Sequence, residues 1–319
     1  MKIVILEAIS VGTDVTWDNL ARFGELVTYA TTRDEEIAER IFDADIVIAN
    51  KCLLREETMK DASRLKLICE AATGYNNIDL AYCKKRGILV TNVRDYSTES
   101  VAQHTFAMLL HVLESLNDMA SFIESGEYSK QESFTRIGIP FHELSGMRMG
   151  IIGLGAIGRR VAQIATAFGM EVVYYSASGR TYEVPYEAVD FDTLLGTSDV
   201  VSCHAPLNEW TERLMDAGAF RKMKKTSIFL NLGRGPIVNE IDLVEALNQG
   251  NIKAAALDVF GKEPMEESSP LLQIRDRDRL LLTPHVAWSS VEARTRLVAD
   301  IEKSIEAFLG GEPRSLVTL

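Results

Sequence analysis

Short apolar runs alternate with longer amphipathic stretches along most of the chain, and this alternation restricts the possible folds more than any other feature. The pattern is typical of parallel β-strands joined by α-helices. In the first third, strands are predicted at 2–6, 45–49, 65–70 and 88–91, and helices at 34–42 and 77–86. A second series of strands is predicted at 150–153, 171–175, 199–204, 227–232, 254–260 and 280–283. These strands are apolar on both faces, as expected where helices cover both sides of a sheet.

The two series predict two α/β domains, each a parallel sheet flanked by helices, and 319 residues suffice for both. The second series stops near Ala287, and one last amphipathic helix is predicted at 293–309. We therefore expect a discontinuous domain of residues 1–98 and 288–319, with a second domain of residues 99–287 inserted into it. The helix predicted at 101–114 has few charges and is expected to be buried, with Ser97 or Thr98 as its N-cap.

Composition excludes several classes of protein. Apolar residues make up 46% and charged residues 25% of the chain, which argues against disorder. No apolar run reaches the ~20 residues that span a bilayer, and Glu7 comes too early for a signal peptide. The net charge of −12 argues against nucleic acid as a partner. The four cysteines lack metal-site spacing and are interpreted as reduced thiols of a cytoplasmic protein without a metal site: Cys52, Cys69, Cys83 and Cys203.

A glycine-rich turn, Gly153-Leu154-Gly155-Ala156-Ile157-Gly158, lies between a predicted strand and a helical stretch at 159–168. In this setting the first glycine permits a tight turn and the second lets a pyrophosphate approach the backbone. The third lets the helix pack closely on the strand, so that the helix N-terminus points at the phosphates. The turn therefore predicts a dinucleotide-binding domain of the Rossmann type at 99–287, although the same turn without a ligand is the alternative.

The end of the next strand bears on the choice of dinucleotide. An acidic residue that accepts the ribose 2′-OH of NAD is expected about 20 residues after the turn, but Ser176 occupies this position. No carboxylate there repels a 2′-phosphate, and Ser176, Ser178 and Arg180 are possible donors to one. NADP is thus physically admissible and somewhat favoured by these residues; alternatively, they form a solvated loop and NAD binds with one contact fewer.

Three later strands end in polar residues, where ligands bind on open α/β sheets. Arg234 stands between two glycines, Glu263 lies in the segment that follows Asp258, and His285 follows a proline. A guanidinium grips a planar carboxylate with two hydrogen bonds. An imidazole exchanges a proton with a carbonyl or hydroxyl oxygen, and a neighbouring carboxylate fixes its tautomer. Each residue alone has an ordinary structural explanation, but together they predict chemistry on a 2-oxo or 2-hydroxy acid.

These motifs, together with the segment from His204 to Leu207, resemble in order those of the D-isomer-specific 2-hydroxyacid dehydrogenase family, over essentially the whole chain. The resemblance implies that Arg234 binds the substrate carboxylate and carbonyl, that His285 is the acid/base, and that Glu263 is its partner. It also implies that the substrate domain contributes Asn50, Thr73, Gly74 and Tyr75. The cofactor site is then predicted to comprise Gly153, Leu154, Gly155, Ala156, Ile157, Gly158, Ser176, Ser178, His204, Ala205, Pro206, Asn231, Leu232, Gly233, Asp258 and Ala287.

Within the family, residues 121–128 and 139–144 resemble the glycerate dehydrogenase branch, also called hydroxypyruvate reductase. The resemblance implies reduction of hydroxypyruvate or glyoxylate to the D-2-hydroxy acid in a cleft between the domains, by a cytoplasmic homodimer with the helix at 101–114 in its interface. The alternatives are a D-lactate-type or aliphatic 2-hydroxyacid dehydrogenase and, in another class, a non-catalytic dinucleotide-sensing scaffold.

Overall fold

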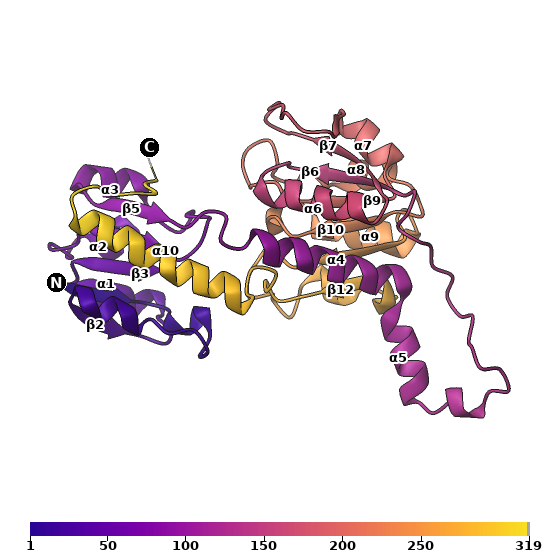
Figure 1. The fold of residues 1–319 in the computed structure, drawn as a ribbon, viewed down its shortest axis with the longest axis horizontal. Coiled ribbons are helices and arrows are strands. Elements are labelled where there is room, and N and C mark those ends of the chain that lie inside the picture. The colour runs from indigo at the N-terminus through magenta and orange to yellow at the C-terminus, as the bar shows by residue number, and fades with distance from the viewer. Residues whose placement is uncertain (318–319) are drawn as a thin grey trace. The chain divides into compact units, whose positions relative to one another are not determined.

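The computed structural model describes residues 1–317, which form two compact units. Unit 1 consists of Met1–Ser97 and the chain from Ser289 onwards, and unit 2 is the inserted segment Thr98–Trp288 (Figure 1). Each unit contains one parallel sheet, so the predicted fold class is confirmed. The boundaries between the units lie one residue from those that the sequence predicts.

Unit 1 is built on a five-stranded parallel sheet in the order β2-β1-β3-β4-β5, which is the flavodoxin-like order. Its buried strands are runs of apolar residues that form the core with α10 (Val291–Leu309) packed against β4. The strands are β1 (Lys2–Ile5), β2 (Glu25–Thr28), β3 (Ile46–Ala49), β4 (Leu67–Glu70) and β5 (Leu89–Asn92). The other helices are α1 (Ile37–Ile41), α2 (Glu56–Met59) and α3 (Leu80–Arg86).

Helix α3 begins three residues later than the sequence predicts. The Asp79 side chain accepts a hydrogen bond from the N–H of Tyr82 at 2.9 Å and so caps the helix at Leu80. Gly87, with a left-handed φ of 70°, ends it. Residues 77–79 therefore belong to the loop that follows β4, and Asn77 is placed in that loop and not on a helix.

Unit 2 is built on a seven-stranded parallel sheet in the order β12-β11-β10-β9-β6-β7-β8, the Rossmann order with one added edge strand. Its strands are β6 (Arg148–Ile152), β7 (Glu171–Tyr175), β8 (Glu187–Ala188), β9 (Val200–Cys203), β10 (Ile228–Asn231), β11 (Ala254–Leu257) and β12 (Leu280–Leu282). Its helices are α4 (Thr98–Glu114), α5 (Leu116–Glu124), α6 (Ala156–Ala167), α7 (Phe191–Thr197), α8 (Ala217–Lys222) and α9 (Glu240–Gln249).

Helix α4 is buried in unit 2, as its lack of charge predicts. It packs against α6 and the strands β10 to β12, and Val101, Phe106 and Leu109 lie in the core (Figure 1). Thr98 is its first residue, and the Thr98 hydroxyl has no hydrogen-bond partner, so Thr98 is not the N-cap. Among residues 1–317, no single helix is long and apolar enough to cross a membrane; only the pair α4 and α5, bent by 63°, passes by length and composition.

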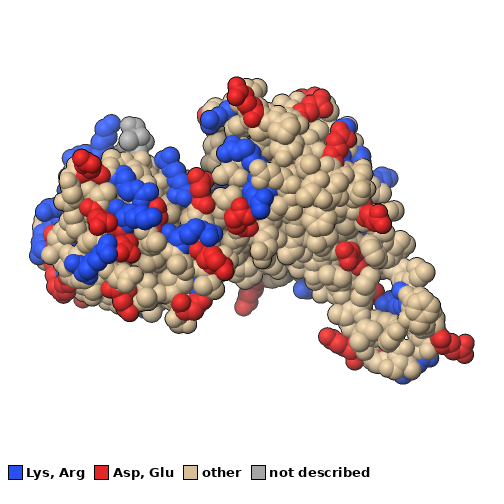
Figure 2. Space-filling model, in the orientation of Figure 1, with Lys and Arg blue, Asp and Glu red and all other residues tan. Residues whose placement is uncertain are grey.

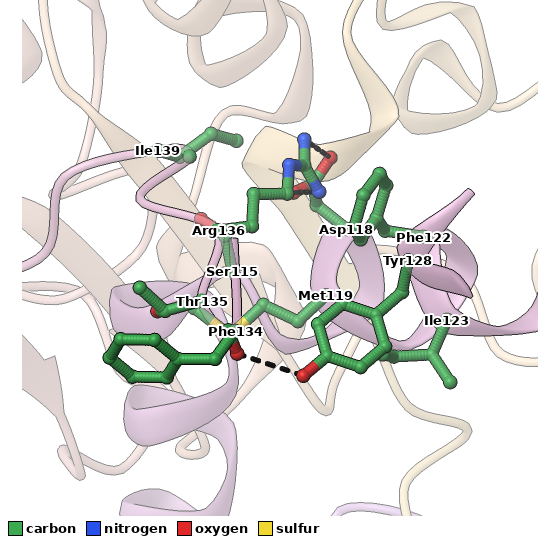
Figure 3. A pocket seen from close by; sticks show the side chains of 11 residues that line it. Ser115, Asp118, Met119, Phe122, Ile123, Tyr128, Phe134, Thr135, Arg136 and Ile139 are labelled. Carbon is green, nitrogen blue, oxygen red and sulfur yellow. Dashed lines mark hydrogen bonds and ion pairs between the residues drawn. The ribbon is translucent and has the colours of Figure 1, made fainter. Parts of the chain in front are cut away.

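A long arm, residues 116–143, extends from the end of α4 and returns to β6 (Figure 1). It consists of α5, a short 3₁₀ turn at Tyr128–Lys130 and an extended return segment. Figure 3 shows how its side chains contact one another: the Tyr128 hydroxyl donates to the Phe134 carbonyl at 2.8 Å, and Arg136 pairs with Asp118 at 2.9 Å. The arm is largely exposed because few of its residues reach the core of the unit.

Charged side chains are distributed differently over the two units on the face of the molecule seen in Figure 2. On unit 1, lysine and arginine are interspersed with aspartate and glutamate, whereas unit 2 has wide uncharged areas. On this face, unit 2 is therefore the less charged of the two units.

Candidate active site

The glycine-rich turn leads from β6 into α6, and its three glycines have three different surroundings. Gly153 has a φ of 91°, and a Cβ there would lie 2.7 Å from the backbone of Ala205. A Cβ on Gly158 would lie 2.3 Å from the carbonyl oxygen of Gly153, whereas one on Gly155 would meet nothing within 4 Å. The first and third glycines therefore allow close packing, and the second leaves open space at the N-terminus of α6. This arrangement fits a dinucleotide pyrophosphate.

The residues after β7 present hydroxyl groups and a cation where the ribose of a dinucleotide is expected. The hydroxyl oxygens of Ser176 and Ser178 lie 3.3 Å apart. The guanidinium groups of Arg159 and Arg180 lie over the ring of Tyr182, at 5.7 and 5.3 Å from its centre. Arg180 is predicted from the sequence, whereas Arg159 is not, because its position beside Tyr182 depends on how α6 packs against the loop after β7.

His204 follows β9, next to the glycine turn. Its Nε2 lies 2.8 Å from the hydroxyl of Ser202, and its Nδ1 is buried without a partner in the described part of the chain. Burial lowers the pKa of His204 to about 3, so this ring is neutral near pH 7. A neutral ring that is held in place suits the wall of a site and not proton transfer.

Arg234 follows β10 in a turn that neighbouring strand ends hold in place. The Asn231 side chain accepts from the N–H of Gly233 and donates to the carbonyl of Arg234, at 3.1 and 3.0 Å. The Arg234 guanidinium donates to the carbonyl of Gly233 at 2.8 Å and remains partly exposed. A Cβ on Gly235 would collide with the backbone of Phe260. The glycines on either side of Arg234 therefore permit close packing of the neighbouring loops. This packing fixes the position of the Arg234 backbone, from which the guanidinium extends.

Asp258, buried after β11, holds the segment that contains His285. Its carboxylate accepts from the N–H groups of Val286 and Ala287 at 2.9 Å and from the Thr283 hydroxyl at 2.6 Å. Its carbonyl accepts from the N–H of His285 at 2.8 Å. His285 has a φ of 54°, a left-handed conformation that costs a non-glycine residue about 1–3 kcal/mol and persists only where the surroundings impose it. Asp258 supplies that constraint.

The sequence-predicted dyad forms at this edge of the sheet. The Nδ1 of His285 lies 2.7 Å from one carboxylate oxygen of Glu263, and the other oxygen accepts from the N–H of Phe260 at 3.1 Å. The carboxylate is thus anchored to the backbone and fixes the orientation of the ring through Nδ1, leaving Nε2 for another partner. Both side chains are about one quarter exposed, so the pair is reachable from solvent.

Two side chains of α4, which the sequence analysis did not assign to the site, support the same segment. The hydroxyl of Ser100 donates to the carbonyl of Ala287 at 2.6 Å, and the Nε2 of His104 lies 3.2 Å from the hydroxyl of Thr283. Ser100 and His104 are four residues apart and so lie on one face of the helix. Only the packing of α4 against the end of β12 reveals this role.

Unit 1 places its own predicted residues at the carboxyl edge of its sheet. The N–H of Asn50 is bonded to the Glu7 carboxylate at 2.9 Å, and the Thr73 hydroxyl donates to the carbonyl of Val93 at 2.9 Å. By contrast, the N–H groups of Gly74 and Tyr75 have no acceptor within residues 1–317. Two adjacent free N–H groups in a loop suit the binding of a carboxylate.

The comparisons with known proteins identify the family. Residues 106–287 match the family model described as D-isomer specific 2-hydroxyacid dehydrogenase, NAD binding domain. The chain belongs to the D-isomer-specific 2-hydroxyacid dehydrogenase family. It is an oxidoreductase of that family, and unit 2 is its domain for a nicotinamide dinucleotide.

Similar proteins match over nearly the whole length. The chain is 36% identical to a hydroxypyruvate reductase of Blautia hydrogenotrophica, covering 99% of both chains. It is 35% identical to a glycerate dehydrogenase of Methylorubrum extorquens, covering 99% of this chain and 98% of that one. The crystal structure of the TT0316 protein from Thermus thermophilus aligns over 100% of both chains with a TM-score of 0.90 and 30% identity.

Proposed function

We propose that this dehydrogenase reduces a small 2-oxo acid, hydroxypyruvate or glyoxylate, to the D-2-hydroxy acid. The observation that carries the proposal is the contact of 2.7 Å between His285 and Glu263, at the same sheet edge as Arg234 and the glycine turn. The names of the relatives, a hydroxypyruvate reductase and a glycerate dehydrogenase, support the choice of acceptor. No feature of the site favours a D-lactate-type enzyme over this one.

Each residue of the site has a separate role in the proposed reaction. When bound, the nicotinamide supplies the hydride that reduces the carbonyl carbon. Arg234 binds the 2-oxo acid and stabilises the negative charge that develops on the carbonyl oxygen, an effect typically worth a few kcal/mol. His285 donates a proton to that oxygen from Nε2, while Glu263 holds Nδ1 and stabilises the charged ring. Asp258 keeps the histidine segment in its left-handed conformation.

We assign the substrate carboxylate to the loop after β4 in unit 1. The N–H groups of Gly74 and Tyr75, which have no acceptor in the described chain, support this assignment. Arg234 and His285, to which the chemistry at the carbonyl is assigned, belong to unit 2.

For the cofactor, we propose that the site accepts NADPH as well as NADH. Ser176 and Ser178 offer hydroxyl groups, and Arg159 and Arg180 bring positive charge to the neighbouring Tyr182. A 2′-phosphate needs such donors and needs the absence of a carboxylate. Residues 176–180 contain no acidic residue.

The arm supports the proposal of a homodimer. Its exposed apolar side chains include Ile123, Phe134, Ile137 and Phe141, and Phe134 and Ile137 are about nine-tenths exposed. Exposed apolar surface on this scale marks an interaction site, and a second copy of the chain is the partner that we propose. We propose that α4, which precedes the arm, contributes to this dimer surface together with it. Light scattering at several protein concentrations tests the homodimer by measuring the molecular mass.

The experiment that tests the function follows the absorbance of NADH and, separately, of NADPH with hydroxypyruvate, glyoxylate and pyruvate as acceptors. Rapid oxidation with hydroxypyruvate or glyoxylate, and slower oxidation with pyruvate, is the expected result. Preference for pyruvate would favour the D-lactate-type alternative. Binding of cofactor without turnover on any acceptor would favour a sensing scaffold.

A further inference from the structure

Glu70, the last residue of β4, is a buried acid that the proposed chemistry does not use. It is fully buried, and one of its carboxyl oxygens accepts from the side-chain amide of Asn77 at 3.0 Å. The other oxygen, Oε1, is buried without a partner in the described part of the chain. A buried carboxyl with one unpaired oxygen is costly to keep and needs an explanation.

Glu70 is joined to two loops at the carboxyl edge of the unit 1 sheet. The Asn77 amide also donates to the carbonyl of Cys52 at 3.2 Å, so a single side chain connects the end of β4 to the loop after β3. Nearer the start of the loop that contains Asn77, the carbonyl of Thr73 accepts a hydrogen bond from the side-chain amide of Asn92, the last residue of β5, at 2.7 Å. The segment between the two attachments contains Gly74 and Tyr75, with their free N–H groups.

We propose that Glu70 is a positioning residue for the 2-oxo acid: through Asn77 it fixes the loop whose N–H groups hold the substrate carboxylate. This inference rests on the proposed function, since it extends the substrate site of unit 1. Glu70 itself does not touch the substrate. It acts by limiting the conformations of residues 71–77, so that less conformational entropy is lost when the acid binds.

The surroundings of Glu70 favour its neutral form. Burial raises the pKa of Glu70 well above its usual range, and the nearby Glu7 raises it further, while Lys51 and the hydrogen bond from Asn77 act in the other direction. The carboxylate of Glu7 is itself bonded to the N–H groups of residues 50–52. Helix α10, which packs against β4, contributes apolar residues and Ser304 to its buried face. A neutral acid also avoids placing a second negative charge behind the substrate carboxylate.

Three variants test this role. Glu70→Gln keeps an uncharged group that accepts from Asn77, and Glu70→Ala removes it. Cys69→Ala is the matched control, because Cys69 is equally buried on the same strand and points to the opposite face. We expect the KM for hydroxypyruvate to rise about tenfold in Glu70→Ala, the size of one lost hydrogen bond. The kcat and the cofactor affinity should change less than twofold, and Glu70→Gln and Cys69→Ala should behave like the parent.

A second readout needs no turnover. Hydrogen exchange of the peptide that contains residues 71–79 is measured by mass spectrometry without substrate. The hydrogen-bonded N–H groups of Ala71, Ile78 and Asp79 should exchange about tenfold faster in Glu70→Ala and at an unchanged rate in Glu70→Gln. Asn77→Ala, at a partly exposed position, should give the same acceleration if Glu70→Ala fails to fold. Equal damage from Gln and Ala at position 70, or unchanged exchange in Asn77→Ala, would overturn the inference. Absence of turnover in the parent with normal exchange results would instead reject the proposed substrate.

Discussion

The carboxyl edges of the two sheets carry polar groups of opposite character. In unit 2, His285 and Glu263 form a pair that is about one quarter exposed. In unit 1, Glu70 is fully buried and joined to a neutral amide. Groups that must gain or lose charge during a reaction need solvent or a charged partner, whereas a group that only holds a loop is best kept neutral and buried. The difference assigns the chemical step to the edge of the unit 2 sheet and the positioning of the substrate loop to the edge of the unit 1 sheet.

The strongest test of this division is the variant His285→Gln. Glutamine is uncharged and cannot act as an acid near pH 7, so we expect kcat to fall about 10²–10⁴-fold, the range for a lost general acid. Cofactor affinity, measured by fluorescence titration, should stay within a few fold. Turnover close to that of the parent would place the proton donor elsewhere and end the distinction between the two edges.

Arg234→Ala tests the same edge through binding as well as rate. The loss of the guanidinium should lower kcat/KM about 10²–10³-fold, as for other donors that stabilise an oxyanion. Arg234→Lys is the matched control: it keeps the charge and loses the two-point grip, and we expect intermediate values. The kinetic constants for hydroxypyruvate give the measurement. An unchanged affinity for the 2-oxo acid in Arg234→Ala would remove its assigned role.

Ser176→Asp sharpens the comparison within unit 2, because it should alter cofactor choice and leave the chemical step intact. A carboxylate at this position accepts from the ribose 2′-OH and repels a 2′-phosphate. We expect the ratio of kcat/KM for NADPH over NADH to fall about tenfold or more. Ser176→Asn, which has the same shape without the charge, is the control. The same ratio in the parent and in Ser176→Asp would place discrimination at Arg159 or Arg180.

The two edges should also respond to pH in opposite directions. His204 has a pKa of about 3 in the folded chain, below its ordinary value of 6.5, so the stability that it contributes is present above about pH 6.5 and is lost on acidification. Glu70 has a raised pKa, so its contribution is present at low pH and is lost as the pH rises towards the folded value. Urea denaturation against pH should show a weaker acid dependence in His204→Gln. In Glu70→Gln, the loss of stability as the pH rises above about 4.5 should be smaller.

The sequence predicted the centre of each sheet well and its edges less well. Interior strands such as β7, predicted to the residue, are continuous runs that are mostly apolar. The edge strands β2 and β8 were missed, because β2 is half-exposed and β8 has only two residues. Helix α5 was also missed, because its apolar face is not buried within its own unit. Exposure at an edge removes the periodic pattern on which such predictions depend.

The candidate site shows the same limit. Motifs that combine glycines with charged residues, such as the turn at Gly153 and the segment around Arg234, were identified from the sequence alone. Glu70 was interpreted as the end of an apolar strand, and Asn77 was assigned to a helix. Their contact depends on the path of a loop and on the cap at Asp79, which local sequence does not fix. The roles of Ser100 and His104 likewise depend on tertiary packing.

The central claim is that this chain transfers a hydride to one face of a 2-oxo acid, with its own residues supplying the proton. The most direct measurement incubates the full chain with hydroxypyruvate and a nicotinamide cofactor deuterated at the transferred position, and analyses the product by chiral chromatography and mass spectrometry. Our account predicts D-glycerate with one deuterium at C2, and at least about 100-fold less of this product from His285→Gln in the same time. Formation of L-glycerate, or of no labelled hydroxy acid, would contradict it.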